Sequence, residues 1–483
     1  MTNQFESNHT SCWALNEFGG ANFGDSRLTT RLIKLADHLA ALPESSINQA
    51  CGSWSEAKAA YRFFQNESIL ESEILNAHVK KTVERTKSYD TILAIQDTCY
   101  ISYKNHGKTK GLGIIASRIR SKTTNFKTPG LVMHTSFALT TDGLAVGLLD
   151  QKIHSRPPLP EGVKELKKKS HGIALAIQDK ESIRWLESLK KTKDALELSN
   201  VRVVTVCDRE ADIYDFFEYS DRIDSPVLVR ARQDRRVNRP SRCSEKNQDT
   251  LWSLIQGLPI QGTLQVEIPL RDNKPARTAI LDLRFGSFIM TPPRNNIRHR
   301  TEKLPPLKLQ AVYVIEKSPP LGESPLEWML LTNLPVNHCD EAVEKVSWYC
   351  MRWKIEIFHK ILKSGLNVEK CRLGTAMRLI RYLTVMSVIA WRLFFLTLLA
   401  RTNPSLPCTV LLAEEEWKVL YAKIHHTLSY PKTPPPVKDV IKWVAQLGGF
   451  LARKGDGQPG PITLWRGWKR LADLSEGWNL ASS

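Results

Sequence analysis

Three carboxylate side chains stand where they could share a cation: Asp97, Asp208 and Glu356. Asp97 ends the apolar run T-I-L-A-I-Q-D, and Asp208 ends the β-branched run V-R-V-V-T-V-C-D, so each is predicted at the carboxyl end of a buried strand. Converging carboxylates repel one another unless a cation lies between them, and oxygen ligands alone favour Mg²⁺ or Mn²⁺. Two such ions activate a water or a 3′-hydroxyl for phosphodiester displacement. Taken singly, each aspartate is explained more simply by a strand-end turn or a helix cap.

The helix that would carry the third acid is predicted between Trp348 and Lys363, because this stretch contains no Gly or Pro. At about 100° per residue, one face collects Tyr349, Arg352, Glu356 and Lys363, and a separate face is apolar. The polar face therefore offers a phenol, a guanidinium, a carboxylate and an ammonium group. The simpler interpretation is an amphipathic helix with a solvated face, on which Arg352 and Glu356 form an i,i+4 ion pair.

The charge balance indicates a polyanionic partner. The 483 residues include 68 Lys+Arg and 50 Asp+Glu, which gives a net charge of +18. Nucleic acid is the first partner that such an excess suggests, and an anionic membrane surface is the second. A basic but otherwise ordinary enzyme is the alternative. The length exceeds what one hydrophobic core usually supports, so two or three domains are expected.

The cysteines and the apolar segments indicate a cytoplasmic protein. The nine cysteines form no C-x-x-C pair and show no zinc-like spacing with histidine, which is typical of a reducing compartment. The polar opening M-T-N-Q-F-E-S-N-H-T predicts no secretory signal. The run from Leu383 to Ala400 is long enough to span a membrane, but Arg392 at its middle predicts a buried helix instead. We therefore expect no membrane partner.

The elements that must position these residues are predicted in three stages. Residues 1 to about 70 have helical patterns, and Arg27, Arg31 and Arg62 lie on basic faces that suit DNA contact or, alternatively, form the charged outside of a small bundle. Strands and helices alternate from about 89 to 217, which predicts a mixed α/β layer with a hydrophobic central sheet. Only short strands follow up to about 340, and they predict an antiparallel β insertion. The chain after Cys371 is mainly helical.

These motifs together resemble the bacterial insertion-sequence transposases of the IS-four family, Tn5 type. The family signature Y-x-x-R-x-x-x-E-x-x-x-x-x-x-K is met in full on the predicted helix, and I-Q-D-T resembles the motif of the first acid. V-C-D-R-E-A-D-I resembles the second motif and selects Asp208 rather than Asp212. P-L-E-W-M-L-L-T carries Trp328, 28 residues before Glu356, where the family has a tryptophan. The likeness extends from G-D-S-R-L-T-T-R-L to L-W-R-G-W and covers nearly the whole chain.

The resemblance implies roles for individual residues. Asp97, Asp208 and Glu356 would hold two Mg²⁺ ions, for which Mn²⁺ can substitute. Trp328 would stack on an extruded base, and Arg230 in V-L-V-R-A-R would lie near the DNA hairpin. The phosphate-gripping residues would be Tyr349, Arg352 and Lys363, and those on the transposon-end duplex would be Arg27, Arg31 and Arg62. This chain has Leu28 after Arg27, where the family's best-studied member has two adjacent basic residues, so end-sequence preference does not carry over. His359 is interpreted either as a DNA contact or as a satisfied helix residue.

The resemblance further implies a DDE enzyme on a ribonuclease-H-like mixed sheet flanked by helices. It would bind inverted terminal repeats of double-stranded DNA, nick, form and reopen a hairpin, and join the 3′-OH ends to target DNA as a homodimer in a bacterial cytoplasm. A catalytically silent inhibitor of transposition and a processing nuclease of the same fold are the alternatives. The implied domains are an N-terminal DNA-binding domain at 1–70, a catalytic domain at 71–377 with its insertion at about 225–340, and a dimerisation domain at 378–483.

Overall fold

The computed structural model divides into two compact units, each described here by itself. Unit 1 comprises Met1–Ser88, Thr98–Pro158 and Ile355–Ser483, and unit 2 comprises Tyr89–Asp97 and Leu159–Lys354. The units are clusters in space and do not test the predicted domain limits, which stay predictions. The residues described by the structure are 13–42, 44–119, 125–158, 176–237, 250–268, 277–293, 298, 302–453 and 456–482.

In the part of the chain that the structure describes, ten strands form one mixed sheet, in agreement with the predicted α/β class. Within unit 2 the first residues of β1 are followed in the sheet by β5, β6, β10, β9, β8 and β7. Within unit 1, β3 pairs in antiparallel fashion with both β2 and β4. The strands are β1 Thr91–Ser102, β2 Gly113–Ile119, β3 Asn125–Thr140, β4 Ala145–His154, β5 Arg202–Cys207, β6 Val227–Arg230, β7 Gly262–Ile268, β8 Arg277–Met290, β9 Leu307–Glu316 and β10 Glu327–Thr332.

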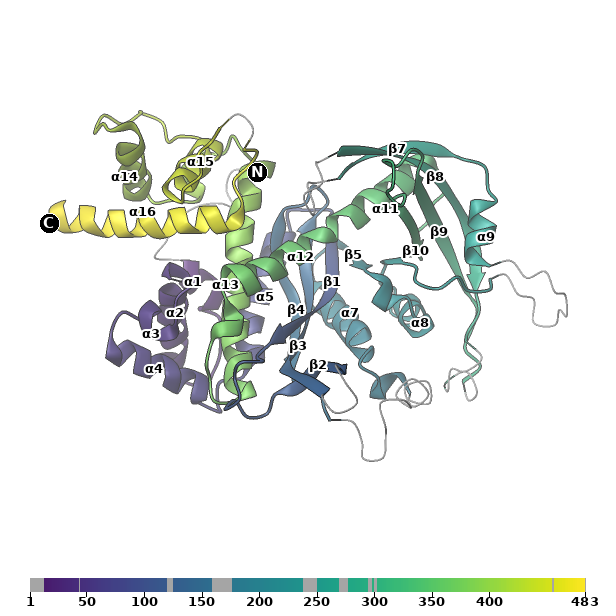
Figure 1. Cartoon of the computed structure of the whole chain (residues 1–483), viewed down its shortest axis with the longest axis horizontal. Helices are drawn as coiled ribbons and strands as arrows, with labels where there is room; N and C mark the ends of the chain where they lie inside the picture. The colour runs from purple at the N-terminus through teal and green to yellow at the C-terminus, as the bar shows by residue number, and fades with distance from the viewer. Residues whose placement is uncertain are drawn as a thin grey trace. The chain divides into compact units, whose positions relative to one another are not determined.

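The core of unit 2 forms where two helices cover one part of the sheet (Figure 1). Helix α7 (Ile183–Leu196) contributes Trp185, and α8 (Tyr214–Arg222) contributes Phe216 and Phe217, all of them buried. These rings pack with inward side chains of β6, β9 and β10. The buried aromatic area stabilises the strands at roughly 25 cal/mol per Å² of apolar surface removed from water. The sheet that carries the two aspartates is therefore stabilised by a hydrophobic core.

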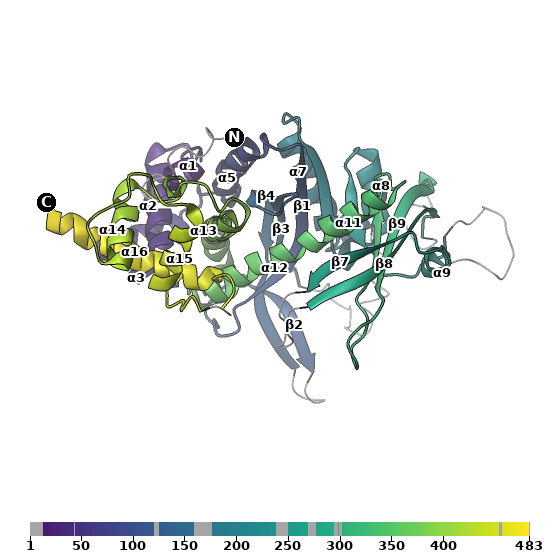
Figure 2. The same ribbon diagram turned by 90° about the horizontal axis from the view of Figure 1, so that it is seen from above.

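The antiparallel strands begin later in the chain than the sequence predicted. We expected the insertion to start near 225, but β6 pairs in parallel with β5, with Val206 opposite Leu228. Strand β6 is therefore part of the parallel core. The strands β7 to β10 are antiparallel to one another, as predicted, and β10 joins β6 in antiparallel fashion. Strands β7, β8 and β9 lie side by side in Figure 2. Local composition does not distinguish the two pairings, because β6 is only a short apolar run.

The N-terminal helices of unit 1 are amphipathic, as the leucine spacing predicts. Asp25 caps α2 by accepting a hydrogen bond from the Arg27 backbone N–H at 2.9 Å. Leucines at 32, 35 and 39 are buried, and Phe23 packs edge-to-face on Phe63 of α4 at 6.1 Å. The helices are α1 Trp13–Phe18, α2 Ser26–Ala41, α3 Ile47–Ala50, α4 Trp54–Gln65 and α5 Glu71–Thr86.

The central helix of unit 1 is α13 (Ala376–Thr402), which contains the apolar run of the sequence. It is long and apolar enough to cross a membrane, but 89% of its most apolar window is buried inside the protein. Helices α2 and α4 pack beside it, as do α15 (Val437–Leu447) and α16 (Pro461–Ser482) (Figure 1). Its buried Arg381 donates to the Ile69 and Phe64 carbonyls at 2.7 and 2.9 Å. The predicted buried core helix is thus observed.

The stretch from Trp348 to Lys363 is not one continuous α-helix, and this corrects the sequence prediction. Helix α11 (Cys339–Met351) ends at Arg352, and α12 (Trp353–Lys360) begins directly after it. A π-helical turn, Ile361–Gly365, follows α12. The wider π turn changes the angular spacing of its residues, so the uniform 100° rule does not hold for Lys363.

Candidate active site

Asp97 and Asp208 each come directly after one of two residues that lie opposite each other on adjacent strands of unit 2. Strands β1 and β5 run parallel, and their register places Gln96 opposite Cys207. The next residue on each strand is an aspartate, and both aspartates are partly exposed, whereas the residues just before them are buried. Asp208 follows the end of β5, as predicted, but Asp97 lies inside β1, which continues to Ser102, so the prediction of a strand end there was wrong. The parallel pairing of β1 with β5 stops just before both aspartates, on the side of the sheet where ligands gather in α/β proteins.

The local geometry distinguishes Asp208 from the nearby Asp212. Asp208 caps a short 3₁₀ turn and accepts one hydrogen bond from the Glu210 backbone N–H at 2.8 Å. Asp212 is buried, accepts from the Arg232 backbone N–H at 2.7 Å, and forms an ion pair with Arg235. Asp212 therefore has a structural role in holding the following loop. The choice of Asp208 as the second acid agrees with this difference.

The pKa of the Cys207 thiol is affected by the charges of the two aspartates. Burial raises the pKa of its thiol well above the usual value, the negative charges of Asp208 and Asp97 raise it further, and the Arg352 guanidinium opposes them. Such charge interactions are stronger in a protein interior than in water, because the interior has a lower dielectric constant. The charges of Asp97, Asp208 and Arg352 therefore all act on one buried residue.

A second group in unit 2 combines aromatic and basic side chains. The rings of Trp328 and Tyr349 meet edge-to-face with their centroids 5.3 Å apart, and the Arg352 guanidinium lies 5.8 Å from the Tyr349 ring centre. Arg230 faces Leu330 in the β6–β10 register, so it lies on the same sheet face as Trp328. Burial lowers the pKa of Arg230, an interaction with Tyr349 raises it, and the charge of Arg209 lowers it. Four residues predicted separately from the sequence therefore form one cluster.

Glu356 lies in unit 1, near the start of α12. The same helix is fixed by buried Ile355 and Phe358, and the Phe358 ring packs on Phe137 of β3 with centroids 5.0 Å apart. Glu356 itself is partly exposed. Its approach to the two aspartates stays a prediction. His359 is buried, and its two interpretations stay predictions.

Lys363 lies in the π-helical turn of unit 1. Its ammonium donates to the Tyr100 carbonyl at 3.1 Å and forms an ion pair with Glu369 at 3.7 Å. Its side chain keeps 35% of its surface exposed. These two contacts fix the position of the ammonium group, which is still accessible to an anion.

The donor set partly fits the predicted metal ions. Asp97 and Asp208 offer carboxylate oxygens on adjacent strands, which suit Mg²⁺ or Mn²⁺. Among the residues that the structure describes, no three His, Cys, Asp or Glu side chains form a group that could hold a metal ion. Carboxylate oxygens favour such a hard cation over zinc, whose sites are usually built from Cys and His ligands.

The N-terminal arginines differ in how they are engaged. Arg27 is highly exposed and pairs with Asp25 at 2.8 Å. Arg31 forms an ion pair with Glu56, which Lys34 also contacts at 2.7 Å. Arg62 is exposed on α4. A DNA phosphate must compete with acidic neighbours for Arg27 and Arg31, and this competition was not visible from the sequence.

Two family models match this chain. A model described as transposase DNA-binding matches residues 10–69, and a model described as the Tn5 transposase dimerisation domain matches residues 388–483. The chain is a Tn5-type transposase. The transposase therefore has a DNA-binding domain that contains α1 to α4, and its family is one with metal-dependent chemistry. The matched dimerisation segment includes α14 (Glu414–His425), α15 and α16.

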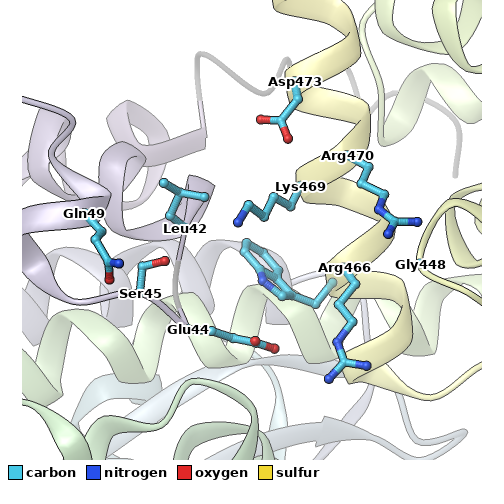
Figure 3. A pocket seen from close by; sticks show the side chains of 10 residues that line it. Leu42, Glu44, Ser45, Gln49, Gly448, Arg466, Lys469, Arg470 and Asp473 are labelled. Atoms are coloured by element: carbon cyan, nitrogen blue, oxygen red, sulfur yellow. The ribbon is translucent and has the colours of Figure 1, made fainter.

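A cleft in unit 1 of the transposase is lined by residues from both matched segments (Figure 3). Its cavity volume is about 510 Å³. Lys469 of α16 points across it toward Leu42, whereas Arg470 points away and donates to the Leu447 carbonyl at 2.6 Å. Glu44 and Asp473 also line this cleft, so its charge is mixed.

Several features of the transposase were missed by sequence reasoning. Glu56 joins Arg31 across 25 residues of sequence, and no local pattern signals that pair. Lys104 and His106, in the lysine- and glycine-rich segment after β1, were not among the predicted site residues. Both line a pocket with Lys363. The high density of lysines in this segment was the sequence signal that could have predicted a role in binding an anion.

Proposed function

We propose that this transposase moves DNA by a cut-and-paste reaction on a ribonuclease-H-like catalytic fold. It would nick at each transposon end, form and reopen a hairpin, and join the freed 3′-OH ends to target DNA. The observation that carries the proposal is the pair Asp97 and Asp208, which directly follow Gln96 and Cys207, the last residues paired between the parallel strands β1 and β5. A phosphodiester reaction needs converging oxygen ligands of this kind.

Asp97, Asp208 and Glu356 would hold the two Mg²⁺ ions, or Mn²⁺ in their place. Bound there, the ions supply activation of the attacking oxygen and stabilisation of the leaving oxygen. The protein's own contribution is to keep the two aspartates at a partly exposed sheet edge above a buried core. Arg352, whose charge reaches Cys207 beside both acids, would bind a phosphate next to the scissile bond.

The aromatic cluster supports the hairpin step. Trp328 would stack on an extruded base, because its ring has one edge-to-face partner, Tyr349, and remains partly exposed. Arg230 on the same sheet face would bind the strongly bent backbone beside that base. Tyr349 and Lys363 would complete the set of phosphate contacts.

The two matched domains support the remaining steps. The DNA-binding domain would recognise terminal inverted repeats through Arg27, Arg31 and Arg62, and the dimerisation domain would bring two copies together on double-stranded DNA. The excess of 18 positive charges favours a polyanion and makes binding salt-dependent. A silent inhibitor would share these features and lack only cleavage.

A plasmid excision assay tests the proposal. The plasmid carries the inverted repeats that flank the gene, and the comparison is between the wild type, Asp97→Asn, Asp208→Asn and the surface control Asp194→Asn. The wild type and the control should excise the segment in Mg²⁺, and the two other variants should bind the ends without excising them. Absence of excision by a folded, end-binding wild type would favour the inhibitor, and excision by Asp97→Asn or Asp208→Asn would overturn the assignment of these acids.

A further inference from the structure

A small pocket in unit 1 lies between the end of β1 and the segment that follows α12. Its cavity volume is about 180 Å³, and its lining includes Lys104, His106, Lys363, Glu369 and Lys370. Small-molecule sites in proteins usually have volumes of roughly 300 Å³ or more and largely apolar walls. This pocket is smaller and polar, so it suits a compact polar group better than a nucleobase or a cofactor.

The pocket is built by contacts between segments far apart in the sequence. The Ser102 backbone N–H donates to the Glu369 carboxylate at 2.7 Å, and the Thr109 hydroxyl donates to the Leu373 carbonyl at 2.9 Å. Two backbone hydrogen bonds join Lys110 to Gly374 and Ala376, at 3.0 and 2.8 Å. These bonds hold the walls in place before any ligand binds, which lowers the entropy lost on binding.

The charge of the pocket selects an anion. Three ammonium groups line it, those of Lys104, Lys363 and Lys370, and Glu369 is its single carboxylate, so their sum is three positive charges less one, or +2. Lys104 and Lys370 are exposed, and neither forms an ion pair with another described residue of the chain. One carboxylate among three ammonium groups does not suit a metal cation. A phosphate oxygen, in contrast, accepts hydrogen bonds from several lysines at once.

His106 adds a polar atom that needs a partner. Its ring packs edge-to-face on Tyr103 at 5.1 Å and forms a hydrogen bond with the Glu369 main chain. Its Nδ1 atom is buried and has no hydrogen-bond partner among the described residues. Buried polar atoms in folded proteins are usually paired, so a ligand or water is expected at this position. An anion there would favour the protonated ring, which donates from Nδ1.

We propose that this pocket binds a backbone phosphate of DNA, with Lys104 and Lys370 as new ligands beside Lys363. The inference rests on the proposed function in one respect only, since it takes Lys363 to face DNA. The proposal adds two DNA contacts beside Lys363, the lysine of the family signature: Lys104, on the loop after β1, and Lys370. The phosphate belongs either to the transposon end or to the target DNA, and both sources offer the same chemistry.

The salt dependence of DNA binding tests the pocket. Full-length Lys104→Gln and Lys370→Gln are compared with Lys108→Gln, an exposed lysine of the same loop that does not line the pocket, on a fluorescent mixed-sequence duplex at 50 to 200 mM salt. Each pocket variant should weaken binding several-fold, and its slope of log K against log salt should be about 0.9 less steep than that of the control. Pocket variants that match Lys108→Gln in affinity and slope would overturn the proposal.

The source of the phosphate is assigned by two further arms. Weaker binding to a duplex that carries the inverted repeat, with normal use of target plasmid, indicates the transposon end; the reverse pattern indicates target DNA. Either pattern supports the pocket. Failure of the proposed function is separate, because it would appear as Mg²⁺-dependent excision that survives Asp97→Asn while the effect of Lys104→Gln on binding remains.

Discussion

Trp328 and Tyr349 lie edge-to-face with ring centroids 5.3 Å apart, although they come from strand β10 and helix α11. Tyr349 is buried, whereas Trp328 is partly exposed. The buried ring therefore fixes the orientation of the accessible one, and an edge-to-face pair adds about 0.5–1.5 kcal/mol beyond area burial. A fixed, accessible indole is what base stacking requires.

Trp328→Ala should leave the first nick unchanged and slow hairpin formation by about tenfold or more, since a stacked base is worth roughly 1–3 kcal/mol. Trp328→Phe should retain part of the rate, because it preserves an aromatic face. Gel analysis of nicked and hairpin DNA over time gives both rates. Normal hairpin kinetics in Trp328→Ala would contradict the stacking role.

Glu56→Gln should strengthen DNA binding. The hydrogen bond from Lys34 lowers the pKa of Glu56, and the charge of Arg31 lowers it as well, so this carboxylate is ionised at neutral pH and competes with DNA for both cations. An exposed ion pair is worth about 0.2–1 kcal/mol, so affinity should rise by up to about fivefold per pair. Fluorescence anisotropy on a mixed-sequence duplex measures the change, with exposed Glu67→Gln as the control. Weaker binding by Glu56→Gln would mean that Glu56 orients the two cations for DNA.

Asp37→Asn should stabilise the protein at high pH and not at low pH. Burial raises the pKa of Asp37 to about 7, although the charge of Arg392 lowers it, and one carboxylate oxygen is buried without a hydrogen-bond partner among the described residues. The folded state thus binds this proton more tightly than the unfolded state, whose pKa is near 3.8, and stability falls as pH rises from about 4 to about 7. Melting temperatures at pH 5 and pH 8 should differ more for the wild type than for the variant. A lower melting temperature for Asp37→Asn at pH 8 would show that an ion pair with Arg392 dominates.

Glu356→Gln should bind transposon ends as the wild type does and lose Mg²⁺-dependent cleavage by about a hundredfold or more, because a metal ligand contributes several kcal/mol to the barrier. The exposed Glu84→Gln is a matched control in the same unit. End binding by gel shift and nicking of supercoiled plasmid separate the two effects. Full cleavage by Glu356→Gln would remove it from the metal ligands.

Sequence periodicity predicted what local chemistry determines. The strand that ends just before Asp208, the amphipathic α2 and the burial of α13 follow from apolar spacing and were observed, whereas the strand predicted to end at Asp97 continues to Ser102. Periodicity could not predict contacts between segments that are distant in the sequence, such as the pairing of Glu56 with Arg31 and the pocket around Lys104. The break at Arg352 and the π turn after Lys360 also escaped prediction, because no Gly or Pro precedes Gly365 in this stretch and tertiary packing overrides helix propensity.

The most direct test of the account is a change of metal preference in nicking. Asp97→Cys and Asp208→Cys replace an oxygen ligand by a softer sulfur ligand, which disfavours Mg²⁺ and tolerates Mn²⁺. The account predicts that both folded, DNA-binding variants lose nicking in Mg²⁺ by about a hundredfold or more and recover part of it in Mn²⁺. Wild-type nicking by both variants in Mg²⁺ would contradict the claim that Asp97 and Asp208 hold the catalytic ions.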